Sequence, residues 1–263
     1  MSALYFISDV HLGIERDEED TARETRLLEL LARIETDGAR LCILGDLFDF
    51  WYEYRHVVPA RSLRVLGALE RLTGAGVEVH YLAGNHDFAL GRYLVEEIGC
   101  EIHLEPFAME FGGTRFYLHH GDGLADRDGG YRLLRRILRN RVLQALWRWV
   151  HPDLGFALAG RISHASRRYT DTKDYGSSRY REDRLAAIAA EGYDWIIMGH
   201  THEVDLRELP GGTRYLNLGS WFDGGAPHAR FADGVLQFVQ ADGSIRAGNE
   251  LFPTPEPGPA PRD

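Results

Sequence analysis

Four short apolar runs, rich in β-branched and aromatic residues, divide the chain in the manner of buried strands. They span residues 4–7, 41–44, 77–82 and 195–198. Between the first two runs, apolar residues recur at helical spacing over 21–36, and leucines do the same over 63–72, between the second and third. The alternation of strand, helix and strand predicts parallel strands joined by crossover helices.

The pattern changes after residue 105. Residues 107–111 and 114–119 flank Gly112-Gly113 and predict a β-hairpin, and further glycine turns predict a meander near the end of the chain. Parallel strands followed by hairpins indicate an α/β fold with two sheets packed face to face and helices outside. We expect one domain over 1–252, with the proline-rich 253–263 as a disordered tail.

Five polar motifs accompany these runs. They are Asp9-Val10-His11, Gly45-Asp46-Leu47-Phe48-Asp49, Gly84-Asn85-His86-Asp87, His120-Gly121-Asp122 and Gly199-His200-Thr201-His202. Groups at the carboxyl ends of parallel strands converge, and the glycines permit tight turns there. Any one motif alone is weak evidence, and Asp9 with His11 alone could be a turn and a surface imidazole. All five in this order predict a single two-metal site.

The donor types of the motifs indicate which ions fit. Carboxylates, one amide oxygen and imidazoles without thiolate suit two divalent ions such as Mn²⁺, Fe²⁺ or Zn²⁺. Such a pair can activate a water molecule and clamp a phosphate, which predicts hydrolysis at phosphorus. Asp49 and Asp122 are expected to hydrogen-bond to ligands, and His86 to act as an acid oriented by Asp87.

The remaining histidines are assigned no role in the site. His119 precedes His120 in a strand and should point to the opposite face, so we interpret it as structural. Six others have no supporting partners in the sequence and are also predicted to be without function: His56, His80, His103, His151, His164 and His228.

Composition narrows the class of protein. The formal net charge of −10 argues against a nucleic-acid partner. Cys42 lies in an apolar run, which predicts a buried free thiol and a protein of a reducing compartment. We see no signal peptide and no run long enough to span a bilayer, and therefore expect a cytoplasmic protein.

The five motifs resemble those of the calcineurin-like metallophosphoesterase superfamily. The resemblance implies a four-layer α/β/β/α sandwich with two metal ions at one end. It implies that His86 protonates the leaving group or stabilises the transition state. It also implies two ligand sets sharing Asp46: Asp9, His11, Asp46 and His202 for one ion, and Asp46, Asn85, His120 and His200 for the other.

Within the superfamily the chain is similar to the UDP-2,3-diacylglucosamine hydrolases, which cleave a lipid-linked nucleotide to UMP and 2,3-diacylglucosamine 1-phosphate (lipid X) in lipid A synthesis. The similarity rests on the second motif through Trp51, on Asp128-Gly129-Gly130-Tyr131, and on a polar helix face in the later segment. It implies Mn²⁺ as the metal and a set of substrate contacts. These are Asn85, His86, Asp128, Ser166, Thr170, Lys173 and His200. His86 replaces the arginine of the best-known members, which bears on the lipid substrate.

A segment over 124–180 interrupts the motifs and is predicted to be a helical lid insertion over the site. Its part from 132 to 151 holds six arginines, no acidic residue, two tryptophans and five leucines. This composition favours either a peripheral element on the inner face of the cytoplasmic membrane or a lid with solvated arginines. Two alternative functions remain: a phosphoesterase for another phospholipid or nucleotide, and a non-catalytic membrane-binding scaffold. The sequence does not determine the oligomeric state.

Overall fold

The computed structural model describes residues 3–13, 17–124, 140–158, 160, 182–222 and 224–247. Four predicted substrate contacts, Asp128, Ser166, Thr170 and Lys173, lie outside this part of the chain, as do most of the predicted lid and the tail. Their roles stay predictions.

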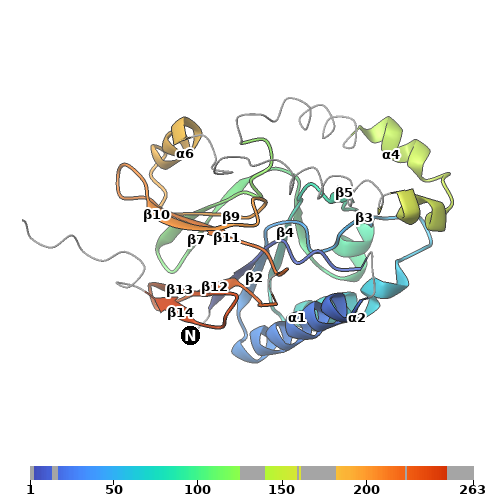
Figure 1. Ribbon diagram of the computed structural model, residues 1–263, viewed down its shortest axis with the longest axis horizontal. Helices are drawn as coiled ribbons and strands as arrows, with labels where there is room; N and C mark the ends of the chain where they lie inside the picture. Colours follow the sequence, from blue (N-terminus) through green and yellow to red (C-terminus); the bar gives the residue numbers. More distant parts are fainter. Residues whose placement is uncertain are drawn as a thin grey trace, which may run out of the picture.

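The larger sheet has seven strands in the order β14-β13-β12-β1-β2-β4-β6 (Figure 1). Its strands are β1 Leu4–Ile7, β2 Arg40–Ile43, β4 Val79–Leu82, β6 Glu101–His103, β12 His228–Ala232, β13 Val235–Val239 and β14 Ile245–Ala247. The first four run parallel, as the strand–helix alternation predicts, and the last three add antiparallel hairpins beside β1.

A second sheet has five strands in the order β10-β11-β9-β8-β7. They are β7 Phe107–Phe111, β8 Thr114–Leu118, β9 Trp195–Met198, β10 Val204–Glu208 and β11 Arg214–Leu218. The predicted hairpin over 107–119 is confirmed as β7 and β8. Two short strands, β3 Trp51–Tyr52 and β5 Asp87–Ala89, follow β2 and β4 along the chain and pair with each other.

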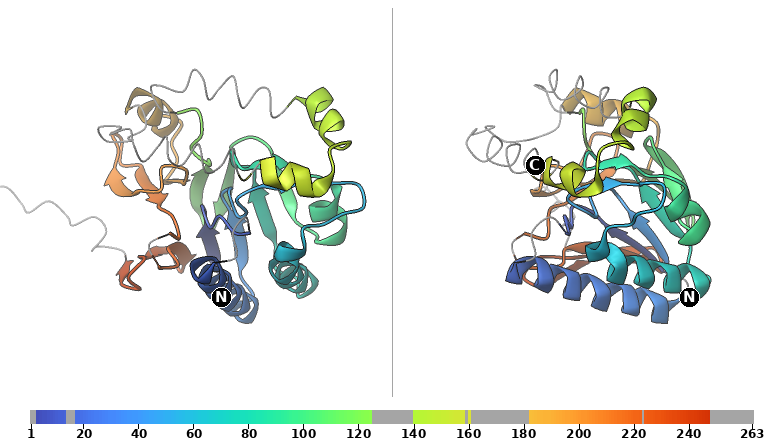
Figure 2. Two further views of the ribbon diagram at one scale, coloured as in Figure 1. Left: turned by 45° about the vertical axis from the view of Figure 1, so that its right-hand side comes forward. Right: turned by 90° about the vertical axis from the view of Figure 1, so that its right-hand side faces the viewer.

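Helices cover the outer faces of both sheets (Figures 1 and 2). They are α1 Glu18–Asp37 and α2 Leu63–Gly74 on the larger sheet and α6 Glu182–Ala189 on the second sheet. Helix α4 Arg141–Trp147 instead packs through Trp147 on Phe50 and Tyr52. The short turns are η1 Ala60–Ser62 and η2 Tyr93–Glu97. The carboxylate of Asp17 accepts a hydrogen bond from the Asp20 amide and caps the start of α1, while Gly38 ends it in the left-handed conformation.

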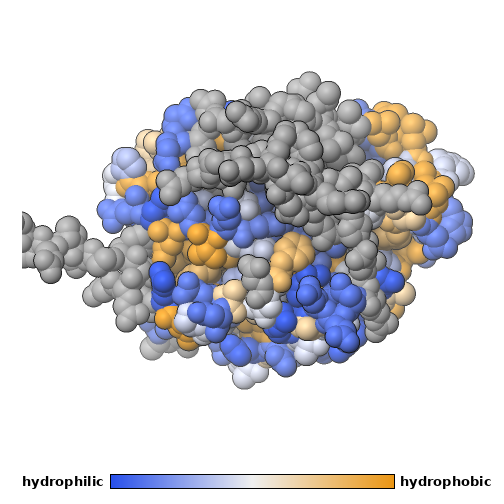
Figure 3. Space-filling model, viewed as in Figure 1, coloured by the Kyte–Doolittle hydropathy of each residue, from blue (hydrophilic) through white to orange (hydrophobic). Residues whose placement is uncertain are grey.

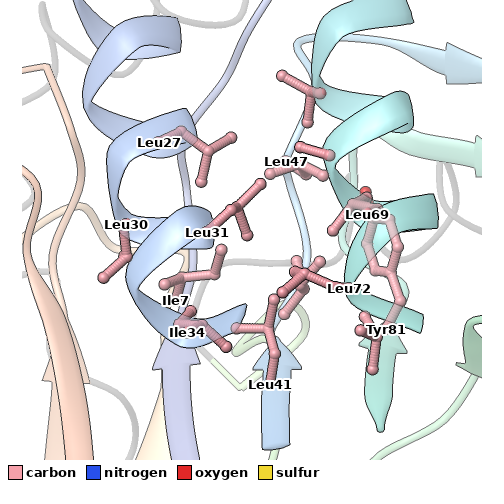
Figure 4. Close-up of a cluster of buried hydrophobic side chains, with 14 of the residues drawn as sticks. Ile7, Leu27, Leu30, Leu31, Ile34, Leu41, Leu47, Leu69, Leu72 and Tyr81 are labelled. Atoms are coloured by element: carbon pink, nitrogen blue, oxygen red, sulfur yellow. The ribbon is translucent and has the colours of Figure 1, made fainter. Parts of the chain in front are cut away.

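Strand alternation produces the layers, because neighbouring residues face opposite sides of a sheet. On β1, Leu4 and Phe6 pack between the sheets, whereas Tyr5 and Ile7 pack toward α1 and α2. Figure 4 shows this second cluster, where Leu31 of α1 and Leu72 of α2 meet the sheet.

The second sheet divides its side chains in the same way. On β9, Trp195 and Ile197 pack between the sheets, and Ile196 and Met198 pack with Leu185 of α6. The predicted four-layer α/β/β/α sandwich is therefore confirmed. In the described part of the chain, every helix is too short or too polar to cross a membrane.

Candidate metal centre

The seven predicted ligands meet at one end of the sandwich. They follow β1, β2, β4, β8 and β9 within a few residues, at the carboxyl ends of those strands. We call this set the central metal centre: Asp9, His11, Asp46, Asn85, His120, His200 and His202. The convergence joins residues almost two hundred positions apart.

One half of the central metal centre gathers around His11. Its Nε2 lies 3.1 Å from Nε2 of His202 and 3.6 Å from Oδ1 of Asp9. Oδ1 of Asp9 is also 3.4 Å from Nε2 of His202. These three side chains therefore direct one nitrogen or oxygen each toward a common point.

The other half gathers around Asn85. Its Oδ1 lies 2.9 Å from Nε2 of His120 and 2.8 Å from Nδ1 of His200. Nδ1 of His120 donates to the carbonyl of Leu44, which fixes the ring so that Nε2 faces inward.

Asp46 lies between the two halves. Its Oδ2 is 3.3 Å from Nε2 of His120 and 3.8 Å from Nε2 of His11. Its Oδ1 accepts a hydrogen bond from the backbone of His86, which fixes the carboxylate. The carboxylate of Asp46 thus lies within 4.0 Å of an imidazole nitrogen of each half.

The backbone of the centre is strained. In the described part of the chain six non-glycine residues have a positive φ, and five of them belong to the central metal centre. These five are Asp9, His11, Asp46, His200 and His202, with φ between 51° and 73°. Residues other than glycine rarely adopt this left-handed backbone conformation. Those that do are concentrated at functional sites.

Two glycines make room for the carboxylates. A Cβ atom at Gly84 would collide with the side chain and the amide of Asp46, and one at Gly199 would collide with Ser8 and Asp9. Both positions therefore need glycine because of close approach, independently of turn geometry.

Burial and neighbouring charges together shift the pKa values of the imidazoles in the centre. Burial alone would lower the pKa of His120, but the charge of Asp46 beside it raises that pKa to about 10. Burial also opposes protonation of His11, yet the carboxylates of Asp49 and Asp9 raise its pKa to about 9. Burial and then the charge of His120 lower the pKa of His200 to about 4.

The donor set fits divalent metal ions. Oδ1 of Asp9 is fully buried and receives no hydrogen bond, although it faces two imidazole nitrogens. A buried carboxylate oxygen without a donor is costly unless a cation lies beside it. Imidazole nitrogens with carboxylate and amide oxygens are ligands that Mn²⁺, Fe²⁺ and Zn²⁺ accept.

His86 lies at the rim of the centre, but its partner is not the expected one. Its Nδ1 donates to the carbonyl of Asp49 over 2.6 Å, which leaves Nε2 4.0 Å from Oδ2 of Asp46. Asp87 instead accepts hydrogen bonds from Tyr81 and from the amides of Asp46 and Gly84. The prediction that Asp87 orients His86 is wrong, because that carboxylate is used to tie two strand ends together.

The other predicted hydrogen-bond partners are buried beside the imidazoles. Oδ1 of Asp49 lies 3.3 Å from Nδ1 of His11, the nitrogen that faces away from the centre. Asp122 is buried as well, and its charge acts to raise the pKa of both His120 and His200.

The sequence pattern gave no indication of two residues that support His11. The ring of Phe222 stacks on His11 with centroids 5.2 Å apart, and the buried guanidinium of Arg23 lies 4.8 Å from the centroid of Phe222. Neither residue belongs to a polar motif, so only the fold reveals them.

Two histidines predicted to lack partners have them. Nδ1 of His80 lies 3.1 Å from Nε2 of His103, and both rings are close to the carboxylate of Glu101. We call His80, Glu101 and His103 the edge cluster. A signal existed in Glu101-Ile102-His103, since residues two apart share a strand face, but β6 was not predicted.

The chain is similar to proteins of known family over most of its length. The calcineurin-like phosphoesterase profile matches residues 3–204. A UDP-2,3-diacylglucosamine hydrolase of Porphyromonas gingivalis is 34% identical, covering 84% of this chain and 90% of the relative. One of Pseudomonas savastanoi is 31% identical, covering 83% and 88%. A solved phosphoesterase of E. coli aligns over 94% of this chain and 98% of its own, with 18% identity and a TM-score of 0.47.

The fold and the centre define a metal-dependent hydrolase of phosphoesters or phosphoanhydrides. The chain belongs to the calcineurin-like phosphoesterase family. Its curated relatives named UDP-2,3-diacylglucosamine hydrolase share 31–34% identity over most of their length. A non-catalytic scaffold is therefore the wrong interpretation.

Proposed function

We propose that the chain hydrolyses the diphosphate of UDP-2,3-diacylglucosamine, giving UMP and 2,3-diacylglucosamine 1-phosphate in lipid A biosynthesis. The observation that carries the proposal is the similarity to the hydrolases of that name, which extends well beyond the five motifs, over 84% of the chain. The retained His86 marks a branch of that family and is compatible with the same reaction.

The proposed ligands follow the two halves of the centre. Asp9, His11 and His202 would hold one ion, Asn85, His120 and His200 would hold the other, and Asp46 would serve both. The distances support this division, because one oxygen of Asp46 lies 3.8 Å from Nε2 of His11 and 3.3 Å from Nε2 of His120. Mn²⁺ is the ion we propose, since hard oxygen donors are mixed with imidazoles.

When bound, the two ions activate a water molecule and clamp the phosphate. The hydrogen-bond partners of the histidines orient the rings for this arrangement. The carboxylate of Asp49 beside His11 and the carbonyl of Leu44 bonded to His120 hold the Nε2 atoms of both rings toward the centre. Nδ1 of His86 donates a hydrogen bond to a carbonyl. Nε2 is therefore the ring atom that would give a proton to the leaving oxygen.

The test is product release from the lipid-linked nucleotide. Protein loaded with Mn²⁺ should release UMP from UDP-2,3-diacylglucosamine, measured by chromatography. A chromogenic phosphodiester serves as the comparison substrate. Cleavage of that small ester without any UMP release would contradict the substrate and leave a general phosphodiesterase, the second candidate function.

We also propose that residues 140–158 contact the cytoplasmic face of the membrane. Apolar side chains are exposed on α4 and just after it, including Leu146 at 59%, Trp149 at 89% and Leu154 at 62% (Figure 3). The exposed Arg148 adds positive charge beside them. An exposed apolar surface with basic residues is typical of elements that bind anionic lipid.

Sedimentation with phosphatidylglycerol vesicles tests this contact. The double variant L146S/W149S should bind severalfold less than the unchanged protein, because it removes apolar area that lipid would bury. I245S is the control, since Ile245 is equally exposed but lies on β14. Equal loss in both variants would contradict a role for α4.

A further inference from the structure

The edge cluster stands apart from the central metal centre and lies on the face of the larger sheet that looks toward the second sheet. His80 of β4 pairs in register with Glu101 of β6, and His103 pairs with Leu82 two residues on. All three side chains therefore project from the same face. Phe107, on the edge strand of the second sheet, stacks on His103 and lies near the ring of His80.

We propose that His80, Glu101 and His103 form a second metal site, which binds one Zn²⁺ ion independently of the central metal centre. This site differs from the centre in its residues and its exposure, and its ligands lie within β4 and β6, whereas those of the centre lie in loops after strand ends. The ion would link β4 to β6, the strand at the open edge of the sheet.

The spacing of the donor atoms supports a metal ion. Nδ1 of His80 and Nε2 of His103 are 3.1 Å apart, and the two oxygens of Glu101 lie 3.4 Å and 3.5 Å from those nitrogens. Tetrahedral zinc with bonds of about 2.0–2.1 Å places neighbouring ligand atoms roughly 3.3 Å apart. The spacing between the two nitrogens, and the spacing from each nitrogen to one of the two Glu101 oxygens, are close to that value.

A hydrogen-bonded cluster explains these spacings less well. One imidazole can donate to the other over 3.1 Å, but 3.4 Å and 3.5 Å exceed the usual range of about 2.7–3.2 Å. A hydrogen bond thus satisfies one of the three contacts, whereas a cation at their centre satisfies all of them.

The surroundings hold the rings as a metal site requires. Phe107 stacks on His103 with centroids 3.6 Å apart and planes at 9°. Nε2 of His80 is buried without a hydrogen bond and lies 3.9 Å from the carboxylate of Glu78, which Arg40 also binds. Metal-binding histidines commonly direct their second nitrogen toward a carboxylate. Burial lowers the pKa of His103, which favours its neutral, ligating form.

The chemistry of the cluster determines the class of ion. Two imidazoles and one carboxylate are a three-ligand set for zinc, with the fourth position left for water. Oxygen-seeking ions such as Mg²⁺ and Ca²⁺ bind such a set poorly. The carboxylate of Glu101 is 66% exposed, so solvent can reach the ion and exchange should be easy.

Metal counting tests the proposal. Metal-free protein is dialysed against low-micromolar Zn²⁺, and bound zinc is measured by mass spectrometry. The unchanged chain should hold three ions, and H103Q and E101Q should hold two. The control H56Q replaces an exposed histidine outside both sites and should hold three. Two ions in the unchanged chain, or three in H103Q, would overturn the proposal.

A second measurement needs no variant and excludes misfolding as the cause. Crystals of the unchanged protein soaked in Zn²⁺ should show an anomalous peak between His80 and His103, in addition to the central pair. Peaks at the central metal centre alone would overturn the site.

Thermal unfolding gives a third measurement, which compares variants. Zn²⁺ should raise the Tm of H103Q less than that of H56Q.

Discussion

The central metal centre and the edge cluster use the same donor chemistry on two kinds of backbone. The centre takes its ligands from loops at strand ends, with five residues in the left-handed conformation. The edge cluster takes its ligands from regular strands, at ordinary φ values, and one of them is largely exposed. The strained, buried arrangement can place two ions at fixed positions, whereas the strand-borne one can bind an ion but lacks the surroundings for chemistry.

The largest expected difference comes from removing one carboxylate in each region. Asp46→Ala removes the bridge, so activity should fall by about 10³-fold or more, and both central ions should bind weakly. Glu101→Ala should leave turnover within about twofold. UMP release with saturating Mn²⁺ measures both. A comparable loss in the two variants would erase the distinction between the regions.

The second difference concerns the rim of the centre. His86→Ala should lower turnover by about 10²-fold to 10⁴-fold, as expected for loss of a general acid, while both central ions are retained. Metal analysis alongside kcat separates these effects. Loss of an ion in H86A would make His86 a ligand and move it from the rim into the centre.

The smallest expected effect concerns packing. Gly84→Ala places a methyl group against Asp46 and should cost about 1–3 kcal/mol of stability with reduced metal binding. Gly67→Ala on α2 meets no atom within 4 Å and should stabilise the chain by roughly 0.5–1 kcal/mol. Urea unfolding of the metal-free proteins compares them. The same sign in both variants would contradict a backbone fitted around Asp46.

The sequence was sufficient for most of the architecture. Apolar runs and turn glycines predicted the parallel strands and the hairpins, because burial and chain reversal leave local patterns. The strands β3, β5 and β6 were missed since they are only two or three residues long. Such short strands owe their existence to neighbours that are distant along the chain.

The same contrast separates the two metal sites. The motifs of the centre were visible because strained loops require glycine and polar residues close together in sequence. His80 and His103 lie on two strands whose pairing depends on the fold, so no local sequence pattern indicates that they are close together. Asp87 shows the opposite failure, since its position beside His86 suggested a partnership that the actual hydrogen bonds do not include.

The five left-handed residues of the centre link metal supply to the integrity of the loops. Each such conformation costs on the order of 1 kcal/mol, and the whole chain of a typical domain is stable by only about 5–15 kcal/mol. Ions that bind the folded loops and not the unfolded ones offset this cost by mass action. A cell short of metal would therefore hold this protein in a looser, more easily degraded form, so that its abundance would follow the supply of the ion it uses.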